Sequence, residues 1–141
     1  PEVLGESPSL VNVGRSGTWN RRQRRTFQRV MSWCTYMRAQ GYQLFCVHLT
    51  SSPARGNRYL LIDFKKLRRR VEAKFQYKVH YLRVETSEGY GVLHMIWGIK
   101  SGVAAYIPQS WLSQQWQELH GAHRVWIQRM SKGGWERKEG E

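Results

Sequence analysis

Hydrophobic residues recur every three or four positions in three stretches of the chain, residues 18–40, 58–75 and 110–121. This spacing places them on one side of a helix, so each stretch is predicted to form an amphipathic helix. In the first of these, Thr18 is placed to cap the start and Gly41 follows the end, as the capping preferences of the two residues favour. The buried stripe of this helix is predicted to comprise Phe27, Val30, Met31, Cys34 and Met37.

Four shorter runs are rich in β-branched and aromatic residues, which is typical of strands, and they cover residues 42–50, 78–86, 91–99 and 123–130. The glycine-rich turn at 88–91 joins the second run to the third, so these two are expected to pair as a hairpin. After the first helix, the order of elements is therefore strand, helix, strand, strand, helix, strand.

This order predicts an α+β fold of the split-βαβ, or ferredoxin-like, plan, with the strand arrangement that RNA-recognition modules share. The short right-handed connections that such folds use give an antiparallel sheet with strand order 4-1-3-2. The helices at 58–75 and 110–121 then cover one face, and the extra helix at 18–40 packs on the other face or at an edge. Four tryptophans are expected in the core, namely Trp97, Trp111, Trp116 and Trp126.

One domain is expected, because 141 residues suit a single hydrophobic core. It is predicted to span residues 18–130, with its βαββαβ core at 42–130. Residues 1–17 carry Pro, Gly and Ser without a clear period and are interpreted as an irregular arm. Residues 131–141 are interpreted as a polar tail.

The chain is strongly basic: 23 Lys and Arg face 10 Asp and Glu, which gives a formal net charge of +13. Such an excess favours a polyanionic partner, with nucleic acid ahead of an anionic membrane surface. Arg21, Arg22, Arg24 and Arg25 crowd the start of the first helix, where the helix dipole disfavours cations. They form either a phosphate-binding cluster or a solvated basic face.

Two features indicate the compartment. The chain has no apolar run of the ~18 residues that a membrane span needs, and its first residues lack the layout of a secretory signal. Cys34 and Cys46 both fall within apolar patterns, which predicts buried free thiols in a reducing environment. We therefore expect an intracellular protein that does not associate with a membrane.

Three side chains of metal-binding type are predicted to meet at one edge of the sheet. His48 lies near the end of the first strand, Glu85 near the end of the second and His94 near the start of the third, and these ends adjoin in the 4-1-3-2 order. Two imidazoles and a carboxylate on one open face can hold Mn²⁺, Mg²⁺ or Zn²⁺. Alternatively, the histidines are half-buried, hydrogen-bonded strand residues. Arg83 is predicted on the same face, where it either pairs with Glu85 or contacts phosphate.

Several of these segments resemble the HUH-superfamily endonuclease domain of rolling-circle replication initiators encoded by plasmids and viruses. The segment FCVHLT (45–50) resembles the motif on the family's first strand, and Val92-Leu93-His94 matches its His-hydrophobic-His triplet. Glu85 stands seven residues before Val92, where the family often places an acidic metal ligand. The resemblance covers roughly residues 42–130.

The resemblance implies a domain that binds single-stranded or hairpin origin DNA and nicks it by tyrosine transesterification, assisted by Mn²⁺ or Mg²⁺ and working with a replicative helicase. It implies metal ligation by His94, Glu85 and His48, and DNA contacts by the arginine cluster, Arg83 and Tyr90. The chain departs from the family in two ways. Val92 replaces the first histidine of the pair, and no tyrosine follows Tyr106 in the sequence. A catalytic residue is therefore not assigned, because the nucleophile is either lost or lies outside this sequence.

Two other function classes remain. One is an RNA-recognition module that binds single-stranded RNA without catalysis, because EGYGVLHM (88–95) loosely matches the stacking motif on its third strand. The match fails at Glu88, Val92 and Met95, which stand where the motif needs a base and two aromatic residues. The other class is a DNA-binding domain that has lost nicking.

The sequence contains two further histidines near the fourth strand. His120 and His123 are interpreted as solvent-exposed loop residues.

Overall fold

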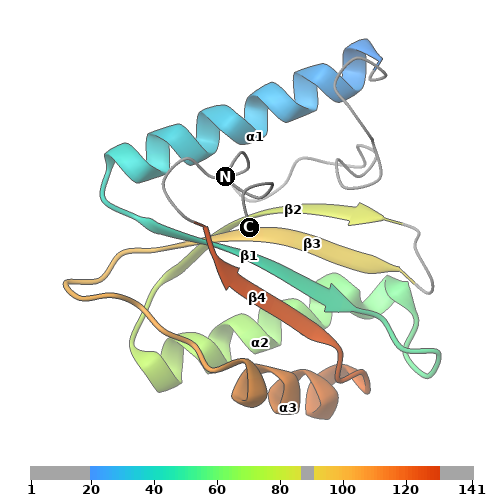
Figure 1. Ribbon diagram of the computed structural model, residues 1–141. Coiled ribbons are helices and arrows are strands. Elements are labelled where there is room, and N and C mark those ends of the chain that lie inside the picture. The colour runs from blue at the N-terminus through green and yellow to red at the C-terminus, as the bar shows by residue number, and fades with distance from the viewer. Residues whose placement is uncertain (1–19, 87–90, 131–141) are drawn as a thin grey trace, which may run out of the picture.

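The computed structural model describes residues 20–86 and 91–130. A four-stranded sheet has one helix on one face and two helices on the other (Figure 1), which confirms the α+β class. The strands are β1 (Gln43–Thr50), β2 (Val79–Thr86), β3 (Val92–Ile99) and β4 (Val125–Arg129). The helices are α1 (Arg21–Ala39), α2 (Leu60–Phe75) and α3 (Gln109–His120), and a short 3₁₀ turn, Asn57–Tyr59, precedes α2.

The strands lie in the order β2-β3-β1-β4, which reads 4-1-3-2 when counted from the β4 edge. Each neighbouring pair is antiparallel, so residues directly opposite one another across a ladder share a face of the sheet. β1 and β3 are the two central strands. Their paired positions therefore define what each face presents.

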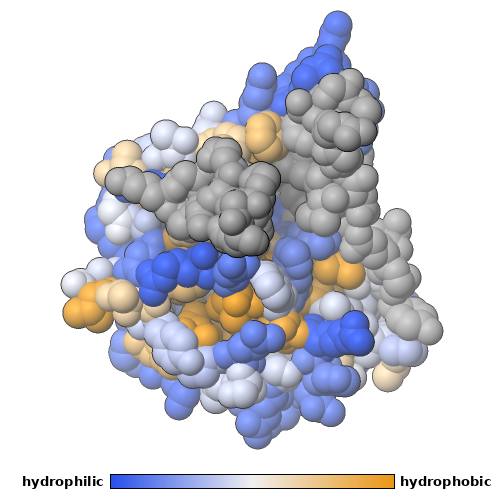
Figure 2. All heavy atoms as spheres, viewed as in Figure 1, coloured by the Kyte–Doolittle hydropathy of each residue, from blue (hydrophilic) through white to orange (hydrophobic). Residues whose placement is uncertain are grey.

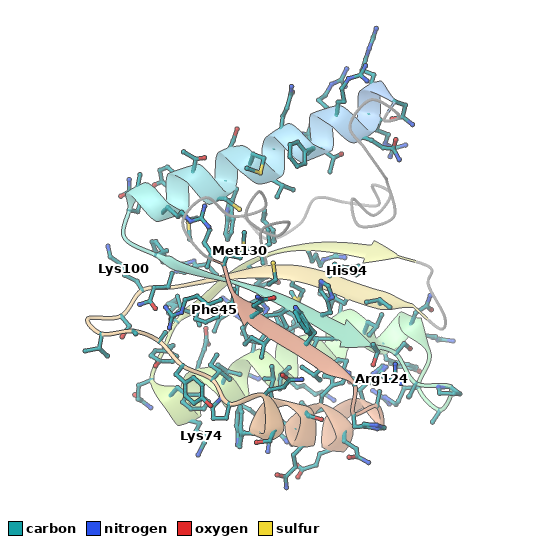
Figure 3. All side chains as sticks on the ribbon, viewed as in Figure 1. Phe45, Lys74, His94, Lys100, Arg124 and Met130 are labelled. Carbon is teal, nitrogen blue, oxygen red and sulfur yellow. The ribbon has the colours of Figure 1, made fainter. Side chains whose placement is uncertain are left out.

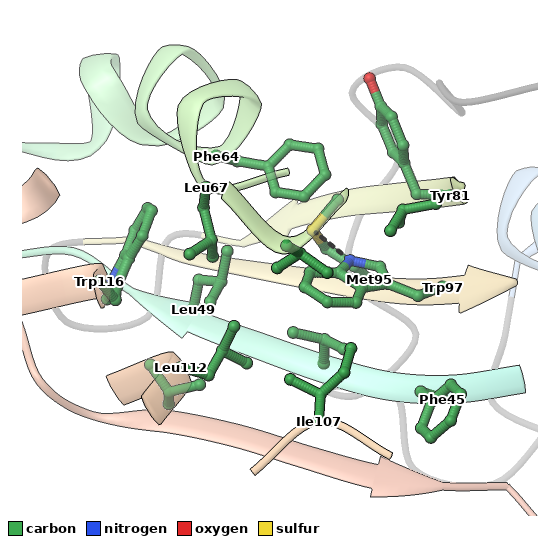
Figure 4. Close-up of a cluster of buried hydrophobic side chains, with 14 of the residues drawn as sticks. Phe45, Leu49, Phe64, Leu67, Tyr81, Met95, Trp97, Ile107, Leu112 and Trp116 are labelled. Carbon is green, nitrogen blue, oxygen red and sulfur yellow. Dashed lines mark hydrogen bonds between the residues drawn. The ribbon is translucent and has the colours of Figure 1, made fainter. Parts of the chain in front are cut away.

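The face covered by α2 and α3 carries the main hydrophobic core (Figure 4). Phe64 and Leu67 of α2 meet Trp97 of β3, and Trp116 of α3 packs against the same layer. Trp97 and Trp116 are fully buried, as the sequence predicts. Trp111 is only half-buried at the margin, where its ring meets that of Phe75 edge to face.

Helix α1 packs on the opposite face, which resolves the two placements left open by the sequence. Val30, Cys34 and Met37 form a second buried cluster with strand residues Leu44, Leu82 and Ile96. Gly98 of β3 permits this close approach, because a Cβ built there would lie 2.9 Å from Met37 Cε. The cluster involves only part of this face of the sheet.

The start of α1 differs from the prediction. The helix begins at Arg21, and Asn20 caps it by accepting a hydrogen bond from the backbone N–H of Gln23, whose side chain accepts one from the N–H of Asn20. This reciprocal pair is a capping box, which satisfies two donors at once. Thr18 lies outside the described residues.

Trp126 also differs from the prediction, since it is 48% exposed rather than part of the core. The register of β1 with β4 explains this, because Trp126 pairs with His48 whereas the buried Val125 pairs with Leu49. Side chains alternate along a strand, so Trp126 projects from the face that α1 partly covers.

The predicted arm at 1–17 and tail at 131–141 lie outside the described residues. Within the described part of the chain, no helix combines the length and hydrophobicity needed to cross a membrane. Cys34 is buried and Cys46 half-buried, and both are free thiols. Burial raises the pKa of Cys34 to about 11, against a smaller opposing effect of the Arg38 charge.

Candidate functional site

Three ring-bearing side chains form a row across the sheet on the α1 side. His94 of β3 pairs with His48 of β1, and His48 pairs with Trp126 of β4. The two imidazoles are in contact, with ring centroids 4.3 Å apart and planes at 79°. The structure therefore brings together two of the three predicted metal ligands.

The third predicted ligand is not placed in that row. Glu85 pairs with Leu93, whereas His94 pairs with Val84, so the backbone register puts positions 85 and 94 on opposite faces. The side chain of Glu85 itself is outside the described residues. The expectation that Glu85 and His94 share a face is wrong, because Val84 rather than Glu85 is paired with His94. A register difference of one residue moves every side chain of a strand to the other face of the sheet.

The same shift applies to Arg83. It pairs with Met95, whose side chain is buried in the core beneath α2 and α3, so Arg83 lies on the face opposite His94. The prediction that Arg83 sits beside the two histidines is therefore wrong. Tyr90, the other predicted DNA contact near this site, lies outside the described residues.

A hollow of about 570 Å³ lies beside the row of rings. The side chains that line it come from β1, β3, the start of α3, the α3–β4 connection and β4. They are His48, Thr50, Val92, His94, Gln109, His123, Arg124, Val125 and Trp126. Figure 3 labels His94 on β3 and Arg124 at the start of β4, both toward the end of the sheet opposite Lys100. The volume of the hollow falls within the range of small-ligand sites, ~300–1,000 Å³.

The rim of the hollow is fixed by hydrogen bonds to three consecutive backbone carbonyls. Gln109 Nε2 donates to Val125 O at 2.7 Å, and Ser113 Oγ donates to His123 O. Thr50 Oγ1 donates to Arg124 O at 2.8 Å. Because the backbone of residues 123–125 is held in this way, the exposed side chains of His123 and Arg124 project from a defined position.

The formal charge around the hollow is positive and comes from Arg124. The described residues that line it also include three histidines but no carboxylate. The four arginines at the start of α1 are exposed and do not line the hollow. They lie at the end of the molecule that is strongly hydrophilic in Figure 2. His123 is exposed, as predicted.

The donor set for a metal is incomplete. Among the described residues, no group of three or more His, Cys, Asp or Glu side chains is arranged to hold a metal ion. Both ring nitrogens of His94 are buried. His48 and His94 could contribute two imidazole nitrogens after a local rotation, and the remaining ligands would have to come from water or from a bound phosphate.

His120 is fully buried rather than exposed, which corrects the prediction. Its Nδ1 donates to Asp63 Oδ2 at 2.7 Å, and its ring stacks on that of Trp116. Arg55 donates to both oxygens of Asp63, at 2.8 and 3.1 Å. Burial alone would raise the pKa of Asp63, but the hydrogen bonds from Arg55 and His120 outweigh it and lower the pKa.

This buried network ties the β1–α2 loop to the end of α3. Ser52 Oγ donates to His120 O at 2.8 Å, and Ser51 Oγ lies 3.4 Å from His120 Nε2. A signal was present in the sequence: Asp63 occupies the apolar stripe of α2 between Leu60 and Phe64, and a buried carboxylate requires partners. The network lies on the side of the sheet that α2 and α3 cover, away from the hollow, so we assign it a structural role.

No family model, curated protein or solved structure matches this chain.

Proposed function

We propose that this chain is the DNA-binding domain of a rolling-circle replication initiator, with a ferredoxin-like core that binds single-stranded or hairpin DNA. The observation that carries the proposal is the pair of histidines in contact on the two central strands, beside a hollow with a basic rim. In the sequence resemblance on which the proposal rests, His94 matches the family's metal-binding histidine. The net charge of +13 supports a polyanionic partner.

The DNA strand would follow the side of the sheet that carries the hollow and α1. Arg124 stands at the hollow, and the exposed cluster Arg21, Arg22, Arg24 and Arg25 stands at the start of α1. Arginines hold phosphates at defined points, and each neutralised phosphate makes binding more sensitive to salt. A replicative helicase of the same plasmid or virus is the protein partner that this function implies.

Metal binding in this proposal depends on the DNA. His48 and His94 would provide two donors for Mn²⁺ or Mg²⁺, and phosphate oxygens would complete the ligand set. When bound, the ion would polarise the phosphate. Tyr106 is 69% exposed in the β3–α3 connection and does not line the hollow, so it is not assigned as a nucleophile. The function proposed for the described residues is therefore binding rather than cleavage.

The test is binding of labelled single-stranded and hairpin oligonucleotides, with and without Mn²⁺. We expect affinity to fall by about 10³-fold or more between 50 and 200 mM salt if roughly six phosphates are contacted. Replacing His94 by alanine should weaken Mn²⁺ binding to the protein–DNA complex, measured by calorimetry. His80→Ala is the matched control, because His80 is a half-buried histidine on the same face, paired with Gly98 under α1.

Absence of oligonucleotide binding at low salt would contradict the proposal. A salt-independent affinity would contradict it as well, because it would indicate a contact that does not involve phosphates. If DNA binds but Mn²⁺ does not bind to the complex, the metal-binding part of the proposal is wrong and the DNA-binding function stands. Appearance of a cleaved or covalently attached strand would show that nicking is retained.

The row of rings favours one alternative, a single-stranded RNA-binding module. RNA-recognition modules place stacking side chains on the same two central strands of an equivalent sheet, where this chain has His48 and His94. Competition between DNA and RNA strands of one sequence distinguishes the two functions. A preference for DNA supports the initiator domain, and a preference for RNA supports the alternative.

A further inference from the structure

The half-exposed Trp126 has no role in the core and lines the hollow. It is in register with His48, which contacts His94, so three flat side chains border one side of the space. An indole beside a basic rim suits a ligand that has both a flat π system and a negative charge. A base with its phosphate has this combination, and base–aromatic stacking is tolerant of base identity.

The backbone that carries the groups that would hold the charge is preorganised. Hydrogen bonds from Gln109, Ser113 and Thr50 hold the carbonyls of residues 123–125. The side chains of His123 and Arg124 therefore start from a backbone that does not need to be ordered on binding, which lowers the entropic cost of association. The described lining contains no carboxylate that would repel an anion.

We propose that the hollow is a single-nucleotide subsite, in which one unpaired base stacks on Trp126 and its phosphate is held by Arg124 with His123 at the rim. This inference rests on the proposed function, because the nucleotide belongs to the bound strand. It adds what the function alone does not specify: the place where a base, rather than the phosphate backbone, is recognised. His48 and His94 border the base from the sheet.

The experiment compares two labelled single-stranded oligonucleotides of equal length, one fully abasic and one with a single central base. Both carry the same phosphates, so their difference in affinity isolates the contribution of the base. We expect the wild-type chain to bind the single-base strand about tenfold more tightly, within the range measured for stacking on one aromatic ring. Trp126→Ala should abolish this difference, and Trp126→Phe should retain most of it.

Two matched controls separate stacking from charge and from general damage. Tyr106→Ala removes another exposed aromatic ring away from the hollow and should leave the difference unchanged. Arg124→Gln should weaken binding of both strands and reduce the salt slope by about one phosphate. Arg69→Gln removes an exposed arginine from α2, on the other side of the sheet, and should change the affinity less.

The outcomes are distinct. If Trp126→Ala keeps the full base-dependent gain, or if the wild type binds both strands equally, the subsite is overturned while DNA binding stands. If the wild type binds neither strand, the proposed function fails and the subsite fails with it. Circular dichroism of each variant checks that the fold is intact, which we expect for a side chain that is already half exposed.

Discussion

Replacing Asp63 by alanine is expected to destabilise the fold more than any surface charge change, because this carboxylate is completely buried and joins three segments of the chain. It accepts hydrogen bonds from Arg55 in the β1–α2 loop and from His120 at the end of α3. Asp63 itself lies on α2, which is the third segment. The substitution removes the carboxylate that both side chains contact.

The magnitude follows from what is left behind. Removing one partner of a buried ion pair typically costs ~3–5 kcal/mol. The side chain of Arg55 is 38% exposed, so water can replace part of what it loses. The ring of His120 is fully buried against Trp116, and its unsatisfied Nδ1–H costs ~1–3 kcal/mol. We therefore expect a loss of about 3 kcal/mol in the free energy of unfolding.

The effect has a defined pH dependence. The pKa of Asp63 is lower in the folded chain than its ordinary value of 3.8. The carboxylate therefore stabilises the fold fully above about pH 4, and this contribution is lost as the pH falls through the folded-state pKa. The difference in stability between the wild type and Asp63→Ala should be constant near neutral pH and should shrink below pH 4.

Urea unfolding followed by tryptophan fluorescence measures both quantities. Glu118→Gln is the control, because it breaks an ion pair with Arg70 whose side chains are 39% and 52% exposed, and such pairs contribute ~0–1 kcal/mol. A loss below 1 kcal/mol for Asp63→Ala would refute the reasoning. A difference that grew as the pH fell below 4 would refute the assigned direction of the pKa shift.

Two further predictions concern the packing of α1. Gly98→Val should lower the unfolding free energy by about 1–3 kcal/mol by pushing Met37 outward, whereas Gly102→Val, where an added Cβ would meet nothing, should change it little in the same urea titration. In a thiol titration of the native chain at pH 8, Cys46 should react first. Cys34, with its pKa of about 11, should react only on unfolding, and comparable rates for the two thiols would contradict its burial under α1.

The element order was predictable because hydrophobic period is a local property. Hydrophobic residues at every third or fourth position gave the helices, and β-branched and aromatic runs gave the strands. With the turn at 88–91, these elements were enough to give the order of the strands in the antiparallel sheet. The apolar buried positions of α2 and α3 followed from the same stripes, as Trp116 and Leu67 show, but the buried Asp63 and His120 did not. The start of α1 was misplaced because Thr18 and Asn20 are both good caps and only the reciprocal bond with Gln23 distinguishes them.

The site was harder to predict, because it depends on register. The sequence placed His48 and His94 in one neighbourhood on the same face, and the ladder between β1 and β3 pairs them. β2 is ambiguous, because Tyr81 and Leu82 are both buried, one on each face of the sheet. With apolar residues on successive positions, alternation alone does not show which face the following residues occupy, and Arg83 and Glu85 were assigned to the wrong one.

The position of Trp126 in the proposed binding site also depends on strand register. Tryptophan is most often an interior residue, but alternation along β4 puts Trp126 on the face of the polar Arg124 and Gln128 and puts Val125 on the face of Ile127. The register with β1 agrees, because it places Val125 opposite Leu49, under α2 and α3, and Trp126 opposite His48. The largest exposed ring on β4 is thus set beside the two histidines by a pairing between strands that are 74 residues apart at Thr50 and Arg124. A recognition surface of this kind is a property of the assembled sheet, so a substitution that shifts the β1–β4 register should abolish base-dependent binding even with every lining residue present.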